Sequence, residues 1–407
     1  RDGSSEIFCK DWDTISCFNI NGSLRWVSDK LNMGRGFLLG LADFNDDGLP
    51  DLAVPSFAAD DISILLGNRD GTLNLIFHTT LGPSPNSADV GDFNRDGRPD
   101  LVVADFSFIS VLYGNGDGTF QSEKRVPVQQ RFFSVAVGHF DDNSADDVAL
   151  LGSNFAVFMN GNFDSTPTAD FGKQGSQLLA PGDLNGDGRE DLLYSASSSF
   201  GGLVTLFGIG NGRFGDPVES LRYVGVRNFA CADWTGDGQK DLVVTTSPVS
   251  YPSTTPATSR FYFGEGDGSF SVHKSSTAGM DPQKIVIGDF DGDGHKDVVA
   301  ANLGSGDLSF FRGVGDGRLE TQIRSAPGAG LGVFETADFN GDGRSDLLVR
   351  NPGYGPTLLV RLSMGGGVFA AGIPIQNTST PLSLALGDLN GDGVIDLAAS
   401  YPGNGGD

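Results

Sequence analysis

The stretch Asp183-Leu-Asn-Gly-Asp-Gly-Arg-Glu-Asp191 follows the pattern D-x-N-x-D-G-x-x-D, and variants of it recur along the chain about every 50 residues. Side chains at positions 1, 3, 5 and 9 of such a loop, with the carbonyl at position 7, offer the oxygen ligands that Ca²⁺ prefers. Gly188 at position 6 permits the sharp turn. The bidentate Glu expected at position 12 of an EF-hand is missing, and no amphipathic helix flanks the loop. The stretch therefore predicts a calcium loop between two strands.

Eight copies of this loop fill the chain, and the residue before each is Ala or Gly. They begin at Asp43, Asp92, His139, Asp183, Asp233, Asp289, Asp338 and Asp388. An apolar run precedes each loop and another follows it. After a variable connection comes a third run, which ends in a glycine-rich turn typical of a β-hairpin. Each copy thus predicts four short strands, the content of one propeller blade, and the small residue is expected where backbones crowd together near a central axis.

The two ends of the chain complement each other. Residues 15–24 predict a third strand, a hairpin and a fourth strand, whereas residues 397–399 predict a second strand after the eighth loop. Joining the two pairs would complete a last blade and hide exposed strand edges. The predicted fold is all-β: one domain over residues 1–407, forming an eight-bladed β-propeller of four-stranded antiparallel blades. N-terminal strands pairing with C-terminal strands close the ring, and residues 1–30 and 380–407 share the last blade.

The segments G-D-L-N-G-D-G-R-E-D-L-L at 182–193 and Y-G-N-G-D-G-T-F at 113–120 resemble the FG-GAP or VCBS repeats of extracellular proteins. Integrin α-subunit propellers, with seven repeats where this chain has eight, and some fungal propeller lectins carry related repeats. The resemblance implies a β-propeller with Ca²⁺ in the loops between first and second strands. It implies no particular ligand.

We predict about seven Ca²⁺ sites. The copy at 139–147 is expected to be empty or weak, because it has lost the first carboxylate and the glycine. Without a cation, the carboxylates packed into each complete loop would repel one another, which argues against turns that hold no metal. The predicted side-chain ligands are Asp43, Asn45, Asp47, Asp51, Asp92, Asn94, Asp96, Asp100, Asp183, Asn185, Asp187, Asp191, Asp233, Thr235, Asp237, Asp241, Asp289, Asp291, Asp293, Asp297, Asp338, Asn340, Asp342, Asp346, Asp388, Asn390, Asp392 and Asp396. The predicted carbonyl ligands belong to Leu49, Arg98, Arg189, Gln239, His295, Arg344 and Val394.

The formal net charge of −25 argues against nucleic acid and anionic membranes as partners. Seven divalent cations would neutralise about half of that charge. No apolar stretch is long enough for a membrane span. The four histidines lie at unrelated positions, and we find no nucleophile elbow, zinc motif or phosphate loop, so we expect that the chain is not an enzyme.

An extracellular or cell-surface location is expected, since loops of millimolar affinity would be empty at cytosolic calcium levels. Asn21 and Asn377 lie in sequons and are candidate glycosylation sites. The Ser/Thr/Pro-rich segment 245–259 is either an O-glycosylated or a merely flexible loop. Cys9 and Cys17 form a disulfide or remain two thiols. The start at Arg1 suggests a mature product or a fragment.

The first functional hypothesis is a calcium-stabilised structural, adhesion or protein-interaction module that can assemble with copies of itself. A carbohydrate-binding lectin and an accessory or catalytic domain of a carbohydrate-active protein are the alternatives. Calcium loops and hairpins are expected to share one face of the disc. We expect a protein or glycan partner on the opposite face, where irregular connections carry aromatic side chains, unless these only cover the blade ends. The aromatic residues are Phe57, Phe106, Phe200, Tyr251, Tyr354 and Tyr401.

Overall fold

The computed structural model of the 407-residue chain consists of β-strands and their connections. It describes residues 6–10, 15–19, 24–27, 39–56, 60–82, 85, 87–105, 108–128, 131–141, 145–152, 155–164, 175–196, 202–220, 225–233, 241–247, 259–264, 270–276, 279, 282–302, 304–316, 319–320, 322–325, 332–350, 358–375, 383–391 and 395–400. All regular structure in these ranges is β, which confirms the all-β prediction. Nowhere in them is there a helix long and apolar enough to cross a membrane.

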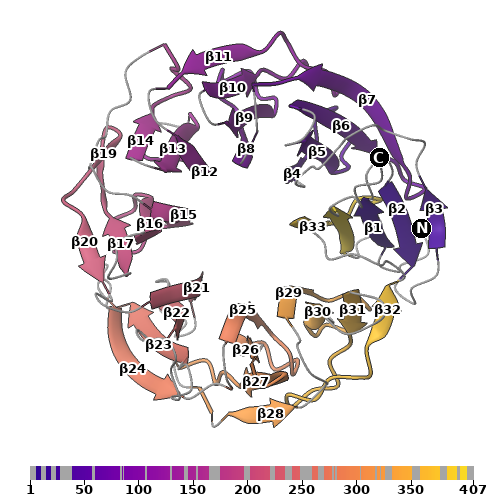
Figure 1. The fold of residues 1–407 in the computed structure, drawn as a ribbon, viewed down its shortest axis with the longest axis vertical. Coiled ribbons are helices and arrows are strands. Elements are labelled where there is room, and N and C mark those ends of the chain that lie inside the picture. Colours follow the sequence, from indigo (N-terminus) through magenta and orange to yellow (C-terminus); the bar gives the residue numbers. More distant parts are fainter. Residues whose placement is uncertain are drawn as a thin grey trace.

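Successive repeats form separate sheets set around a common axis, with the first strand of each innermost (Figure 1). The first sheets comprise β4 (Leu39–Ala42), β5 (Asp51–Ser56), β6 (Asp61–Gly67) and β7 (Leu73–Thr80); β8 (Ser87–Gly91), β9 (Asp100–Ala104), β10 (Phe108–Leu112) and β11 (Lys124–Pro127); and β12 (Phe132–Gly138), β13 (Asp147–Gly152) and β14 (Phe155–Phe158). Next come β15 (Gly175–Gly182), β16 (Asp191–Ala196), β17 (Leu203–Leu206) and β20 (Val218–Ser220), with a ribbon of β18 (Gly208–Gly210) and β19 (Arg213–Phe214).

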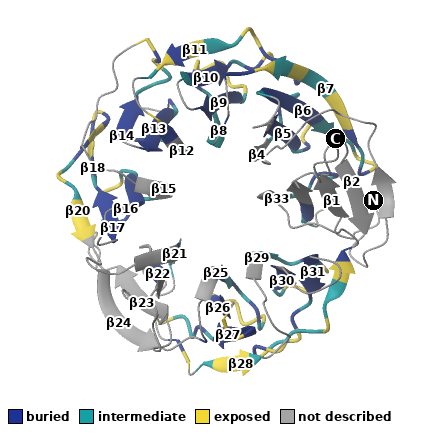
Figure 2. Cartoon of the chain, viewed as in Figure 1, coloured by how far each residue is buried: buried dark blue, intermediate teal, exposed yellow. Residues whose placement is uncertain are grey.

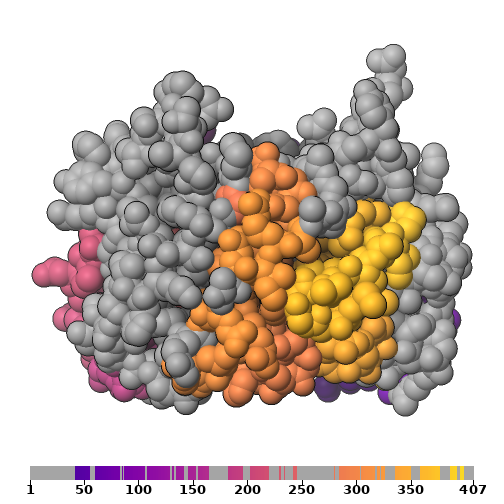
Figure 3. Space-filling model, turned by 90° about the horizontal axis from the view of Figure 1, so that it is seen from below, coloured from indigo at the N-terminus to yellow at the C-terminus, as the bar shows by residue number. Residues whose placement is uncertain are grey.

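The second half of the ring repeats this arrangement. Its sheets comprise β21 (Gly225–Ala232), β22 (Asp241–Ser247), β23 (Ser259–Gly264) and β24 (Phe270–Ser276); β25 (Pro282–Gly288), β26 (Asp297–Asn302), β27 (Asp307–Phe311) and β28 (Ile323–Ser325); and β29 (Gly332–Ala337), β30 (Asp346–Arg350), β31 (Leu358–Arg361) and β32 (Ile373–Ile375). Seen edge-on, the repeats from β25 to β32 follow one another side by side along the rim (Figure 3).

Strands from both chain ends share one sheet, in the order β3-β2-β1-β34-β33. Its members are β33 (Ser383–Gly387), β34 (Asp396–Ser400), β1 (Glu6–Lys10), β2 (Ile15–Asn19) and β3 (Leu24–Val27). The prediction of four antiparallel strands is wrong for this sheet. β1 lies between the predicted pairs and runs parallel to β34, with Ile7 opposite Leu397. The apolar run Ile7-Phe8-Cys9 gives β1 the composition of a strand, which the repeat pattern had left unassigned.

An aromatic residue at position 2 of the loop, as at Phe44, Phe93, Phe140 and Phe290, packs against the hairpin of the next repeat. Ring centroids lie 5.5 Å apart for Phe44 and Phe120 and 5.8 Å apart for Phe290 and Phe369. Side chains at this position are buried, as are the second strands, whereas outer strands such as β7 and β28 carry the exposed residues (Figure 2). Phe44 therefore packs between two neighbouring repeats. Trp234 lies outside the described residues.

The small residue before three of the loops, at Gly91, Gly138 and Gly288, makes room for a side chain of the neighbouring repeat. A Cβ at Gly138 would collide with the carboxylate of Glu190, which accepts a hydrogen bond from the His139 N–H at 2.8 Å. Likewise, a Cβ at Gly91 would lie 2.9 Å from the Asp146 carboxylate. The crowding predicted near the axis therefore involves side chains reaching between repeats.

The aspartate at position 9 ties each loop to the hairpin of its own repeat. Its Oδ2 accepts the N–H of position 2 and its Oδ1 accepts the N–H of the first hairpin residue. For Asp147 the donors are Phe140 at 2.8 Å and Asn160 at 2.6 Å. The same two bonds recur at Asp51, Asp100, Asp191, Asp297 and Asp346, and all six carboxylates are buried. In these repeats the acidic loop and the hairpin lie at the same end of the sheet, as predicted.

Asp147→Asn should destabilise the protein by about 1–3 kcal/mol, with or without calcium, because the amide can accept only one of the two buried N–H groups well. Thermal and urea unfolding measure the change. Asp164→Asn removes the same charge from an exposed ion pair with Lys124 and should leave the free energy of unfolding within about 0.5 kcal/mol of its original value. Equal effects of the two substitutions would contradict the role assigned to position 9.

Deletion of residues 1–25 should expose the edge of β34 that pairs with β1, and an uncovered strand edge promotes association. The shortened chain is expected to melt at a lower temperature and to form oligomers in size-exclusion chromatography with light scattering. A shortened chain that stays monomeric with an unchanged melt would show that the β1–β34 pairing contributes nothing.

Candidate metal sites

Five of the predicted loops lie entirely within the described residues: 43–51, 92–100, 183–191, 289–297 and 338–346. The loops at 233–241 and 388–396 are described in part. Outside the described residues are Thr235, Asp237, Gln239, Asp392 and Val394. The aromatic residues predicted to bind a partner on the face opposite the loops also lie outside the described residues: Phe57, Phe106, Phe200, Tyr251, Tyr354 and Tyr401. The same holds for the sequon residues Asn21 and Asn377 and for the side chains of Cys9 and Cys17.

Each fully described loop is held in a ring by its own carboxylates. In the loop at 183–191, Asp183 Oδ2 accepts the N–H of Gly188 at 2.7 Å, and Asp187 Oδ1 accepts the N–H of Arg189 at 2.9 Å. Equivalent bonds occur in the other four loops. Gly188 has φ +85°, so the turn predicted at position 6 is present. The loop therefore brings the predicted oxygen-bearing side chains together at one turn.

Position 4 is a second left-handed turn that the sequence analysis missed. Gly186 and Gly292 occupy it with φ of +73° and +80°, whereas Asp46 and Arg95 adopt φ of +59° and +61° without being glycine. A non-glycine residue in this region costs about 1 kcal/mol. Glycine at position 4 in several copies was the signal available in the sequence.

Position 3 is an asparagine in four of these loops, and its amide supports the neighbouring aspartate. In the first loop, Asn45 Nδ2 donates to Asp47 Oδ2 at 3.0 Å. The equivalent donors in the other three are Asn94, Asn185 and Asn340. The amide N–H can thus hold the position-5 carboxylate in place, while the amide oxygen remains inside the loop.

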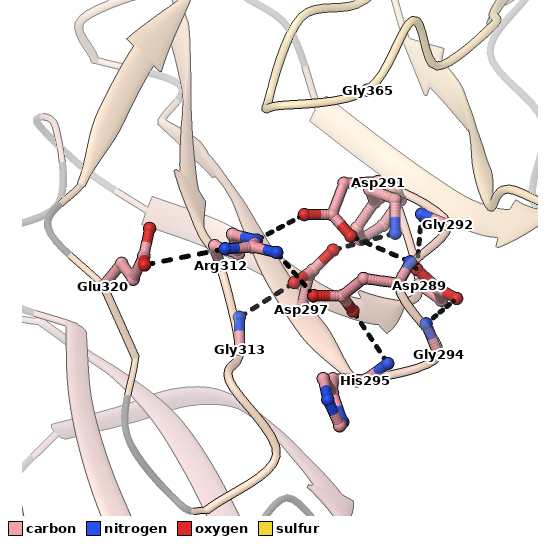
Figure 4. Close-up of polar contacts among 12 residues, drawn as sticks. Asp289, Asp291, Gly292, Gly294, His295, Asp297, Arg312, Gly313, Glu320 and Gly365 are labelled. Atoms are coloured by element: carbon pink, nitrogen blue, oxygen red, sulfur yellow. Dashed lines mark hydrogen bonds and ion pairs between the residues drawn. The ribbon is translucent and has the colours of Figure 1, made fainter.

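The loop at 289–297 has Asp291 at position 3, and Arg312 takes the place of the missing amide (Figure 4). Arg312 Nε donates to Asp291 Oδ2 at 2.5 Å and Nη2 to Asp293 Oδ2 at 2.7 Å. Arg312 follows β27 and comes directly before Gly313, whose N–H bonds to Asp297. The sequence analysis missed it because it lies outside the loop motif.

The donor set of this loop fits a hard divalent cation. Asp289, Asp291 and Asp297 each place a carboxylate oxygen within 4.8 Å of the others. Aspartates at positions 1, 3 and 9 thus converge as predicted, although they lie up to eight residues apart in sequence. Carboxylate oxygens at such spacing suit Ca²⁺, which takes six to eight oxygen ligands.

Burial raises the pKa of the position-9 aspartates to about 6, and neighbouring carboxylates add to the effect. For Asp51, burial is the largest cause, and the charges of Asp47 and Asp43 act in the same direction against two backbone hydrogen bonds. Burial likewise raises the pKa of Asp100, Asp147, Asp191, Asp297 and Asp346 to about 6. A cation beside such a carboxylate would favour its ionised form.

In the copy at 139–147, the side chains at two of the predicted ligand positions contact other side chains of the protein. His139 replaces the first carboxylate, and its Nε2 lies 3.1 Å from Asp146 Oδ1. Asp141, at position 3, accepts a hydrogen bond from Asn160 Nδ2 at 3.0 Å. Residues 142–144 are outside the described residues. A vacant or weak site in this copy stays a prediction.

Solved structures similar to the chain share its fold at low identity. A lectin from Agrocybe aegerita that recognises non-reducing terminal N-acetylglucosamine is 16% identical, with TM-score 0.51, over 79% of this chain and 90% of the lectin. The Dos1 propeller is 11% identical, with TM-score 0.49, over 95% and 88% of the two chains. A periplasmic gluconolactonase from Pseudomonas aeruginosa is 17% identical, with TM-score 0.46, over 80% and 96%. No curated protein sequence matches the chain.

The prediction that the chain is not an enzyme has to be corrected. It was drawn from missing catalytic motifs, yet the similar solved structures include a gluconolactonase. At such identity the likeness concerns the fold alone, and no activity passes from it to this chain.

The FG-GAP-like repeat model matches residues 43–103, 92–150, 183–244, 249–300, 289–349 and 338–399. These matches cover more than half of the sequence, and five of the six begin at the first residue of a loop described above. Those five extend from the loop through the second strand and into the next repeat, so they match the repeating unit as well as the acidic residues. The chain therefore belongs to the family of proteins built from FG-GAP-like repeats.

Proposed function

We propose that this protein is an extracellular β-propeller, stiffened by about seven Ca²⁺ ions, that serves as a rigid binding module for a protein or glycan partner. The observation that carries the proposal is the convergence of Asp289, Asp291 and Asp297, which places three carboxylates from one loop within reach of one cation. The hydrogen-bonded rings of the other four fully described loops support it, because they have the same local geometry.

We further propose that the ring has eight blades and closes through the sheet shared by the two chain ends. The eight copies of the loop and the pairing of β1 with β34 support this. A contact between the last and first repeats supports it as well, since a Cβ at Gly67 would lie 2.8 Å from the Leu389 carbonyl oxygen.

Calcium bound at several weak sites would contribute substantially to stability by mass action. With a Kd of about 100 μM, about 1 mM Ca²⁺ adds roughly 1.4 kcal/mol per site. Seven such sites add about 10 kcal/mol, comparable to the whole free energy of unfolding of a typical domain. The proposed role of calcium is therefore to hold the loops rigid, while the partner binds at the opposite face. Glycan-array binding distinguishes a lectin from a protein-binding module.

Removal of calcium by EDTA should lower the melting temperature sharply. Asp187→Asn should lower the melting temperature in calcium and change it little in EDTA, because the amide oxygen can still accept the Arg189 N–H while one ligand charge is lost. Differential scanning calorimetry in both conditions measures this, with Asp164→Asn as the charge-matched control. A melt that excess EDTA leaves unchanged would refute the calcium proposal.

The calcium-depleted protein should become more stable as the pH falls from 7 to 5. The position-9 carboxylates have a pKa of about 6 in the folded protein against an ordinary value of 3.8, so the folded state binds protons more tightly in this range. The gain in the free energy of unfolding starts as the pH falls through about 6. It is complete once the pH is below the pKa of these carboxylates in the unfolded chain. Melting temperatures of protein depleted on a chelating resin test this, and Asp147→Asn should show a smaller gain. An identical pH dependence in that variant would contradict the assignment.

A further inference from the structure

The loop at 289–297 differs from the other fully described loops in its charge. Positions 1, 3, 5 and 9 carry four aspartates here, whereas loops 43–51, 92–100, 183–191 and 338–346 carry three aspartates and one asparagine. In those four loops the asparagine amide bonds the position-5 carboxylate. Asp291 has no amide to donate. Without Arg312, its carboxylate would face that of Asp293 with no side-chain hydrogen-bond donor between them.

Arg312 occupies a place that is apolar in the other described repeats. In each of those repeats, the first hairpin residue donates its N–H to the position-9 aspartate. The residue just before that donor is Leu66, Tyr113, Met159, Phe207 or Leu362. The guanidinium bridges two carboxylates of the loop, and Nη1 lies 3.6 Å from Glu320. It thus restores the net charge of this site to that of the asparagine-bearing loops.

The arginines at position 7 of other loops lie beside the position-5 aspartate. Arg98 and Arg189 lie 3.8 Å and 3.6 Å from one of its oxygens, and Arg344 lies 2.6 Å from one. Arg312 instead holds one oxygen of position 3 and one of position 5, and the side chain of Asp291 is only 11% exposed. A cation using both oxygens has to displace the guanidinium.

We propose that Arg312 is a built-in counter-cation that competes with calcium at the loop 289–297, so that this loop fills at a higher calcium concentration than the asparagine-bearing loops. The inference rests on the proposed calcium binding and adds an order in which the sites fill. When calcium is scarce, Arg312 offsets one of the four negative charges of the loop and keeps its shape. When calcium is abundant, the guanidinium gives up Asp291 and Asp293 and turns toward Glu320 and solvent.

The test compares Arg312→Leu, which installs the residue found at 66 and 362, with the wild-type protein. Equilibrium dialysis with atomic absorption counts bound Ca²⁺ as a function of free Ca²⁺. Asp289→Ala, which removes a predicted ligand of this loop, identifies the binding step that belongs to it. Arg324→Leu is the matched control, because it removes an equal charge from the same sheet, where Arg324 pairs with Asp307 at the far end of β27.

Arg312→Leu is expected to tighten that binding step by about tenfold, because a unit positive charge no longer opposes a divalent cation at contact distance. Arg324→Leu should leave it unchanged. In EGTA, Arg312→Leu should melt below the wild-type protein, and the gap should narrow in saturating calcium. Asp291→Asn combined with Arg312→Leu recreates the asparagine-bearing loop and should recover the melt in EGTA.

The outcomes separate this inference from the proposed function. If the wild-type protein binds no calcium at all, the proposed function fails and this inference fails with it. If calcium binds but Arg312→Leu leaves the step identified by Asp289→Ala unchanged or weaker, only the competition is overturned. Weaker binding would show instead that Arg312 helps calcium to bind, by positioning Asp291 and Asp293 for the ion.

Discussion

The buried carboxylate at position 9 is the interaction on which the geometry of each repeat depends. It joins the loop after the first strand to the hairpin after the third by accepting one backbone N–H from each. A buried negative charge is expensive, and two backbone N–H groups offset only part of that cost, as the raised pKa shows. The same loop offers further carboxylates, so a cation that binds there relieves repulsion that the fold itself creates. The residue that holds the loop to the hairpin is thus also one of the predicted calcium ligands.

Contacts between repeats are built from the same loop. The ring at position 2 leaves its own loop and packs on the hairpin of the next repeat, as Phe44 does on Phe120, and Gly118 donates its N–H to the Phe44 carbonyl at 2.9 Å. Acidic side chains reach back in the other direction, as Glu190 does to His139. Each repeat therefore buries its apolar side chains only when both neighbours are present. Stability is then a sum of repeat and nearest-neighbour terms, as in other repeat proteins.

The sequence predicted what lies within one repeat and along one strand. The position-6 turn at Gly188, the burial of Phe44 and the small residue at Gly138 all follow from local spacing and are present. What it missed depends on segments brought together by folding. Arg312 reaches Asp291 across 21 residues, and β1 pairs in parallel with a strand from the other end of the chain. The bond from Gly67 to Asp51 joins residues 16 apart, and no nine-residue motif contains both.

The third repeat shows that the two tasks of the loop are separable. It has exchanged its first aspartate for His139 but keeps Asp147 with both backbone bonds, and its strands still occupy their sheet. A repeat can therefore lack the first aspartate of its loop and still form its sheet. If the loops bind calcium as proposed, the number of ions can vary while the repeats keep their strands. If the repeats differ in calcium affinity, they would become rigid one after another as the calcium concentration rises. The rigidity of the whole disc would then increase gradually with calcium instead of changing in a single step.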